Sequence, residues 1–148
     1  MFNIKNRDTL EINGHELCFP TPISRAYAVS NLPEERNNPK DNPYHVFEIQ
    51  GIVVVCIYPE TDLDVEKLKL YKISHPEYSS NRNVWAFDAN GNKIWEIEAI
   101  REATILGQSA PYTALKIRDG KIYAFNWVGY ECEIDPPTGK ILSEDYHR

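Results

Sequence analysis

Two carboxylates near the C-terminus, Glu131 and Glu133, have a spacing that could serve chemistry on a sugar. They alternate with Tyr130, Cys132 and Ile134, so on a strand both would project from one face. A pair of carboxylates does the acid–base work of most glycoside hydrolases. The same alternation is also that of an amphipathic strand whose polar face meets water, and we favour this second interpretation.

Histidine, serine and glycine show no arrangement that predicts a catalytic or metal site. No two of the four histidines have metal-ligand spacing, and no nucleophile elbow, phosphate loop or dinucleotide fingerprint occurs. These histidines are His15, His45, His75 and His147. We therefore expect a protein that is not an enzyme and that holds neither a metal nor a cofactor.

The three cysteines are Cys18, Cys56 and Cys132, and each lies in an apolar run typical of a strand. An odd number in such contexts does not predict a disulfide framework. We expect three buried free thiols in a reducing compartment. The N-terminus lacks the apolar core of a signal peptide, and the longest apolar run, Ile52 to Tyr58, is too short to span a bilayer. These features favour a cytoplasmic protein without a membrane partner.

Charge and two aromatic residues beside a turn favour a protein partner. The formal net charge of −6 opposes binding to nucleic acid, because phosphate contacts require lysine and arginine. An acidic surface suits a basic partner, although it also simply aids solubility. Trp127 and Tyr130 lie beside a turn, where they could anchor an interface or cap the end of a sheet. Our predicted partner-binding residues are Asp119, Trp127, Tyr130, Glu131, Asp62 and Asp64.

These side chains must be positioned by β-hairpins. The stretch Asn83 to Ile97 has two β-prone runs around a turn at Asp88 to Asn92, and a near copy occupies Cys132 to Leu142. The offset between the two turn aspartates, Asp88 and Asp135, is 47 residues, which is in the range of repeated four-stranded units.

Two further hairpins are predicted by Asn13-Gly14 and Asp119-Gly120, which favour type I′ turns. In the first hairpin the residues expected to share one buried face are Leu10, Ile12, Leu17 and Phe19. The second hairpin begins an unbroken four-stranded meander of residues 113–118, 121–126, 130–134 and 140–142. An earlier meander is expected from residues 24–30, 46–58, 83–88 and 93–97, after a loop at 33–43.

Within residues 46–58, Gly51 predicts a bulge or bend, and Ile52 to Ile57 is apolar on both faces, as in a central strand that is covered on both sides. Residues 61–73 are ambiguous. Thr61 or Asp62 could cap a short helix over residues 64–71 with Val65 and Leu68 inward, but residues 68–73 also alternate like a strand.

These elements predict one all-β domain over residues 1–148. About ten strands would form two packed antiparallel meander sheets, with the N-terminal hairpin extending an edge and with one short helix.

The two turn regions resemble the blade hairpins of propeller proteins of the quinoprotein type. The matching pieces are Trp85-Ala86-Phe87-Asp88 with Lys93-Ile94, and Glu133-Ile134-Asp135 with Gly139-Lys140-Ile141. A closed propeller takes about four to eight blades, and this chain is long enough for two.

The whole chain also resembles a group of small bacterial all-β proteins. The matching residues are Asn81 to Val84, Phe87-Asp88, Asp119 to Lys121, Asn126-Trp127, Gly129-Tyr130, Ile134-Asp135 and Thr138 to Lys140. Acidic proteins of this size are common among the immunity proteins of contact-dependent growth inhibition. The resemblance implies that the chain binds and neutralises a basic protein toxin, and the alternative is a carbohydrate-binding or hydrolytic module.

Overall fold

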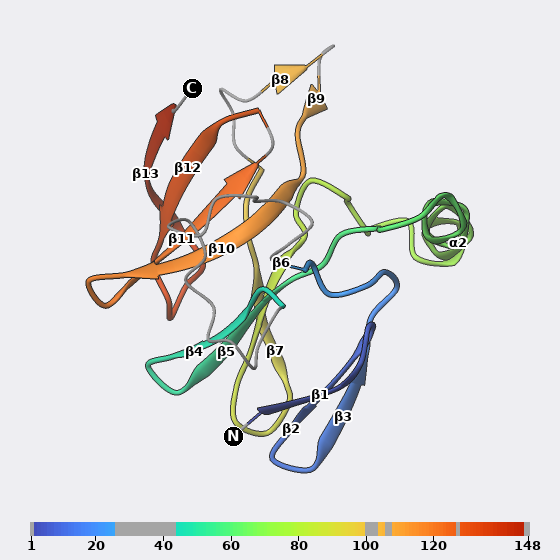
Figure 1. Ribbon diagram of the computed structural model, residues 1–148, viewed down its shortest axis with the longest axis horizontal. Helices are drawn as coiled ribbons and strands as arrows, with labels where there is room; N and C mark the ends of the chain where they lie inside the picture. Colours follow the sequence, from blue (N-terminus) through green and yellow to red (C-terminus); the bar gives the residue numbers. More distant parts are fainter. Residues whose placement is uncertain (1, 26–43, 100–103, 106–107, 127, 147–148) are drawn as a thin grey trace.

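The computed structural model describes residues 2–25, 44–99, 104–105, 108–126 and 128–146, with side chains left undescribed at 104, 105, 108 and 109. The described chain is mostly β-structure with one helix, α2 (Asp62–Ser74) (Figure 1). This confirms the predicted fold class. The helix is not long and apolar enough to cross a membrane, and no other helix occurs among the described residues.

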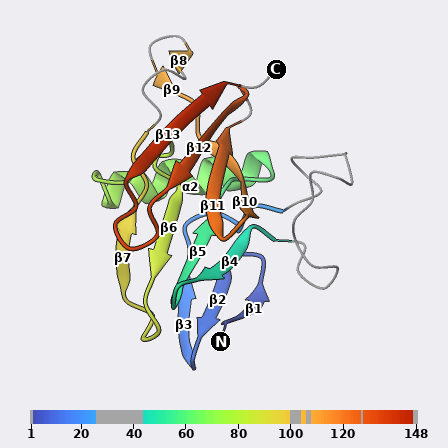
Figure 2. The ribbon, with the colours of Figure 1, turned by 90° about the vertical axis from the view of Figure 1, so that its left-hand side faces the viewer.

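Three antiparallel sheets are stacked in layers (Figures 1 and 2). The N-terminal sheet contains β1 (Phe2–Asn6), β2 (Thr9–Ile12) and β3 (His15–Cys18). The central sheet contains β4 (Val46–Ile49), β5 (Ile52–Cys56), β6 (Val84–Phe87) and β7 (Lys93–Glu96). The third sheet contains β10 (Tyr112–Arg118), β11 (Lys121–Asn126), β12 (Tyr130–Ile134) and β13 (Ile141–Tyr146). A small pair, β8 (Thr104–Ile105) and β9 (Gln108–Ser109), lies between the last two sheets in sequence.

The two inner strands of the central sheet, β5 and β6, are buried on both faces because they are apolar on both faces. In β5, Val53 and Val55 pack with the N-terminal sheet, whereas Val54 and Cys56 pack with the third sheet. Neighbouring residues of a strand point to opposite faces, so one apolar run serves two cores. The prediction of a central strand covered on both sides is confirmed.

Several turns have the conformation that their residues require. Asn13-Gly14 and Asp119-Gly120 have positive φ at both positions, as type I′ turns need. Gln50-Gly51 has the same geometry and joins β4 to β5. The prediction of one bent strand over residues 46–58 was therefore wrong, because the chain reverses at Gly51 rather than bending.

The two meanders correspond in their last hairpins. Asp88 precedes the turn from β6 to β7, and Asp135 precedes the turn from β12 to β13. In each turn the backbone amide of the aspartate donates a hydrogen bond to the carbonyl oxygen of the residue just before the next strand. The acceptor is Asn92 at 2.9 Å in the first turn and Lys140 at 2.8 Å in the second. The predicted 47-residue offset thus relates the β6–β7 hairpin of the central sheet to the β12–β13 hairpin of the third sheet.

Other expectations need correction. The N-terminal hairpin does not extend an edge of the central sheet; it pairs with β1 and covers one face of that sheet with Leu10, Ile12 and Phe19. Ile23 and Arg25 form isolated bridges, and residues 26–30 of the predicted strand and the predicted loop at 33–43 lie outside the described residues.

All three cysteines are free thiols. Cys56 and Cys132 are buried as expected, but Cys18 is exposed, because its strand turns this side chain away from the core.

The helical interpretation of residues 61–73 is confirmed, and the helix extends beyond residues 64–71 at both ends. Leu68 packs inward as predicted, whereas Val65 is 39% exposed.

The turn from β12 to β13 is seated on a tryptophan of the central sheet. Trp95 Nε1 donates a 2.7 Å hydrogen bond to the carbonyl oxygen of Pro136. Gly139 has φ +76°, and a Cβ at this position would lie 2.4 Å from the Trp95 ring. Glycine is therefore required here for two reasons, backbone conformation and close approach.

We expect Gly139→Ala to destabilise the fold by about 2–5 kcal/mol, the sum of left-handed strain and overpacking. The matched control is Gly120→Ala, with φ +74° and no atom within 4 Å of the added methyl group, where strain alone should cost about 1–2 kcal/mol. Urea unfolding of both variants measures the difference. Equal losses of stability in the two variants would show that the Trp95 ring can move away from the added methyl group at little cost.

His45 links the central sheet to the third sheet. Its Nδ1 lies 3.2 Å from both the amide nitrogen and the carbonyl oxygen of Leu115, and its Nε2 has no hydrogen-bond partner among the described residues. Burial lowers the pKa of His45 to about 4, which the contact with Leu115 only partly opposes. The folded protein therefore holds a neutral imidazole.

Because the unfolded imidazole protonates near pH 6.5 and the folded one near pH 4, the stability gained from His45 is present above pH 6.5 and is lost as the pH falls toward 4. The full loss should be on the order of 3 kcal/mol. We expect His45→Asn to flatten the stability curve over this pH range in chemical denaturation. Parallel curves for the variant and the parent protein would contradict this assignment.

Candidate functional site

One connection in the central sheet is far longer than its counterpart in the third sheet. Residues 57–83 join β5 to β6 and include α2, whereas residues 127–129 join the corresponding strands β11 and β12. Neighbouring antiparallel strands need only a short turn. The long excursion is therefore not required by the sheet, and long connections of this kind commonly carry function.

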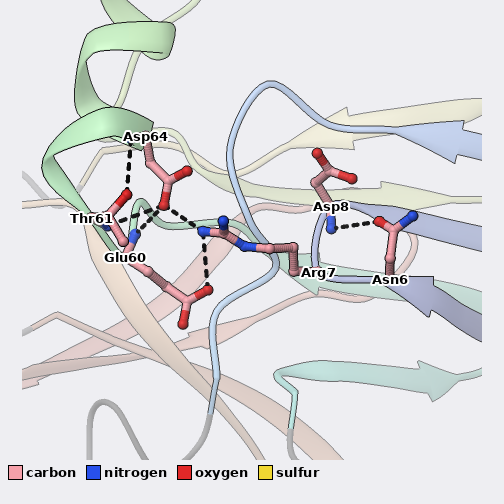
Figure 3. Close-up of polar contacts among 6 residues, drawn as sticks. All are labelled: Asn6, Arg7, Asp8, Glu60, Thr61 and Asp64. Carbon is pink, nitrogen blue, oxygen red and sulfur yellow. Dashed lines mark hydrogen bonds and ion pairs between the residues drawn. The ribbon is translucent and has the colours of Figure 1, made fainter.

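A buried carboxylate fixes the start of α2 (Figure 3). Asp64 Oδ2 accepts hydrogen bonds from Arg7 Nη2 at 2.5 Å and from the backbone amides of Glu60 and Thr61, each at 3.1 Å. The Asp64 amide donates to Thr61 Oγ1 at 3.1 Å, which completes a capping box. Arg7 also lies 3.3 Å from Glu60, so the turn between β1 and β2 holds the helix N-terminus.

Burial alone would raise the pKa of Asp64, but hydrogen bonds from Glu60, Thr61 and Arg7 outweigh burial and lower it. The group is thus ionised in the folded protein at neutral pH and acts as the acceptor that orders this turn.

A cleft of about 720 Å³ opens between α2 and the segment that returns from it to β6. The helix contributes Val65, Leu68, Lys69 and Lys72. The opposite side and the floor come from both flanking loops and the ends of neighbouring strands, namely Ile57, Tyr58, Pro59, Tyr78, Ser79, Ser80, Asn81, Asn83 and Pro111. The cleft therefore has an apolar part and a polar part, as small-ligand sites commonly do.

The outward face of α2 carries an apolar stripe, which we define as Leu63, Leu70 and Ile73. These side chains are 64%, 68% and 76% exposed. Their spacing of seven and three residues places them on one side of the helix, opposite the side that buries Asp64 and Leu68. No described residue covers the stripe, and grouped exposed apolar side chains are typical of interaction sites.

The outer face of the third sheet presents aromatic rings that are already covered by cations. Lys116 Nζ lies 5.1 Å from the centre of the Phe125 ring, and the Arg118 guanidinium lies 4.3 Å from that of Tyr123. Arg118 also lies 3.3 Å from Glu131. A sugar that stacked on the same faces of these rings would have to displace the cations.

The described members of the predicted partner-binding set lie in separate parts of the molecule. Asp119 is exposed in the turn before β11, whereas Tyr130 follows the turn after it; the six-residue strand separates them by roughly 16–20 Å. Tyr130 is half-buried against Tyr146, with ring centres 4.8 Å apart. Trp127 lies outside the described residues.

Two carboxylates expected at the surface are buried. Glu131 is only 6% exposed and lies beside Arg118, and Asp64 is 6% exposed within the contacts described above. Asp62 remains exposed beside the apolar stripe, and α2 lies on the opposite side of the molecule from β12 and β13 (Figures 1 and 2). The expectation of solvated carboxylates was wrong at both buried positions, because each meets an arginine from another strand or turn.

The sequence held a signal for the stripe that we did not use. Once Leu68 is placed inward on a helix, Leu63 and Leu70 must point away from the body, because they lie more than 120° around the helix from it. The cleft had no such signal, since its walls come from segments that only the fold brings together.

A family model described as a domain of unknown function, DUF7957, matches residues 40–146. The match includes the central sheet, α2 and the third sheet, and it leaves out the N-terminal sheet with Arg7. No curated protein matches the chain.

We expect Asp64→Ala to destabilise the protein by about 2–3 kcal/mol, because it leaves two backbone donors without their acceptor and removes half of the capping box. Arg7→Ala should cost about 1 kcal/mol, since Arg7 is half exposed and solvent screens its charge. Urea unfolding of the single and double variants gives the coupling energy, which should be clearly above zero. Lys5→Ala, which removes a surface pair with Glu11 at 3.7 Å, is the control and should change little. If the stability losses of the two single variants simply added up in the double variant, the contact between Arg7 and Asp64 would not contribute to stability.

Proposed function

We propose that this chain, which belongs to the family of the domain of unknown function DUF7957, is a partner-binding protein of the immunity type. It acts in the cytoplasm by binding a basic protein toxin and blocking its action, without catalysis of its own. The resemblance to small all-β immunity proteins and the net charge of −6 support this proposal.

The apolar stripe on α2 is the main observation that supports this proposal. Leu63, Leu70 and Ile73 extend over about 15 Å of helix, given a rise of about 1.5 Å per residue. An exposed apolar helix face is commonly buried in a groove of a partner, and its large side chains then supply most of the binding energy. The capping box and Arg7 hold this helix in place, so little conformational entropy would be lost on binding.

Charge has a different role in this proposal. The excess of carboxylates over the whole surface would attract a basic toxin and raise its association rate. Asp62 and Glu66 lie next to the stripe and would form part of its rim. Rim contacts between exposed charges should contribute on the order of 0–1 kcal/mol each and should weaken in salt.

The proposal predicts that a gene beside the one for this chain encodes a toxin domain, and the test uses that domain. We expect the parent protein to restore growth of cells that produce this domain, and the double variant Leu63→Ser, Leu70→Ser to lose protection and at least about tenfold in affinity, since two interface anchors are removed. Leu142→Ser is the matched control, because Leu142 is 56% exposed on β13, away from the helix.

Circular dichroism and thermal melting must show that the double variant remains folded, which is expected because both leucines face solvent. Protection by the folded double variant would overturn the assignment of this surface. Absence of protection by the parent protein would overturn the immunity function itself.

A further inference from the structure

The cleft beside α2 differs in charge from the rest of the protein. Its described lining contains two lysines, Lys69 and Lys72, and no carboxylate, although the whole chain has a net charge of −6. Charges of one sign along a concave wall favour a ligand of the opposite sign. The lining therefore points to an anionic group.

Three side chains of the cleft lining can donate hydrogen bonds. Lys72 Nζ donates to the carbonyl oxygens of Tyr78 at 2.5 Å and of Pro76 at 3.5 Å, which hold the ammonium at the wall and leave one N–H group for a ligand. Lys69 Nζ lies 3.2 Å from Glu66, but both side chains are two-thirds exposed, so this pair is weak and the ammonium can turn to a ligand. Ser79 Oγ donates to Asn81 Oδ1 at 2.5 Å, so the side-chain amide of Asn81 presents its N–H groups as donors.

Another part of the lining is apolar. Pro59 and Pro111 line the cleft together with Val65, Leu68 and Ile57. These side chains offer a surface for a hydrocarbon group, whereas the lysines and Asn81 offer donors. The volume of about 720 Å³ lies within the range of about 300–1,000 Å³ that small-ligand sites occupy.

We propose that the cleft binds a small amphipathic carboxylic acid. The carboxylate meets Lys69 and Lys72, and the hydrocarbon part lies against the prolines, Val65 and Leu68. A carboxylate accepts charge-assisted hydrogen bonds from ammonium groups, and burial of the chain adds apolar area. This site is on the inner side of α2, whereas the apolar stripe is on the outer side, so either site can fail without the other.

Hexanoate is a suitable probe, and hexanamide is its neutral match. We expect hexanoate to shift the backbone amide signals of residues 65–72 and 78–83 in two-dimensional NMR of the full chain, with saturation and with weaker binding in salt. Hexanamide should bind at least about tenfold more weakly, because it cannot form the charge-assisted bonds.

The variants Lys69→Gln and Lys67→Gln distinguish binding of the acid in the cleft from a general attraction to the positive charges of α2. Both remove one positive charge from the exposed part of α2, but Lys67 does not line the cleft. Lys69→Gln should weaken hexanoate binding about tenfold, and Lys67→Gln should leave it unchanged. Both lysines are exposed, so both variants should fold, and the same spectra show whether they do.

Three results would overturn the proposal: no saturable shift in the cleft, equal binding of the acid and the amide, or equal losses in the two lysine variants.

Discussion

The central sheet must be covered on both faces, and the rest of the structure depends on this constraint. Val53, Val54, Val55 and Cys56 succeed one another on β5, so each face of this strand is apolar. Exposure of either face would cost roughly 1.5–3 kcal/mol for each large side chain. The third sheet covers one face and the N-terminal sheet covers the other, and neither layer could be removed without exposing a core.

Two contacts tie these layers together at the ends of their hairpins. Trp95 of the central sheet supports the turn that contains Gly139, and Asn13 of the N-terminal sheet donates a 2.9 Å hydrogen bond to Ala89 in the turn after β6. His45 adds a buried polar link to Leu115. Sheet packing alone would tolerate sliding, whereas these directional contacts select one arrangement.

The excursion that contains α2 is the part of the central sheet that packing does not require. It is held at its start by Asp64 and at its end by Tyr78, whose ring packs edge-on against Tyr71 and Trp85. A helix anchored at both ends can keep an apolar stripe in water and a cleft open beneath it. The two surfaces that we connect with function therefore lie on a fixed support, as precise binding sites require.

Local backbone preferences explain how much of this fold the sequence alone determined. Asn13-Gly14 and Asp119-Gly120 predict their turns because only certain residues tolerate positive φ, and the apolar runs predict their strands. The C-terminal meander, the two-sided strand β5 and the helix capped by Thr61 follow from such local signals. The turn at Gln50 was missed because it has no Asn or Asp, although the pairing of Ile49 with Ile52 leaves Gln50-Gly51 as a tight turn.

Only the tertiary structure decided which polar side chains face water. Asp64 is buried because Arg7, 57 residues away in sequence, reaches it, and Glu131 is buried beside Arg118 from a strand that is not its neighbour in the sheet. The strand period of two residues and the helix period of 3.6 residues do not predict such distant partners. Asp64 and Glu131 were therefore wrongly predicted to lie in solvent. The cleft and the separation of Asp119 from Tyr130 likewise depend on which segments the fold brings together, and that depends on long-range packing rather than on local sequence.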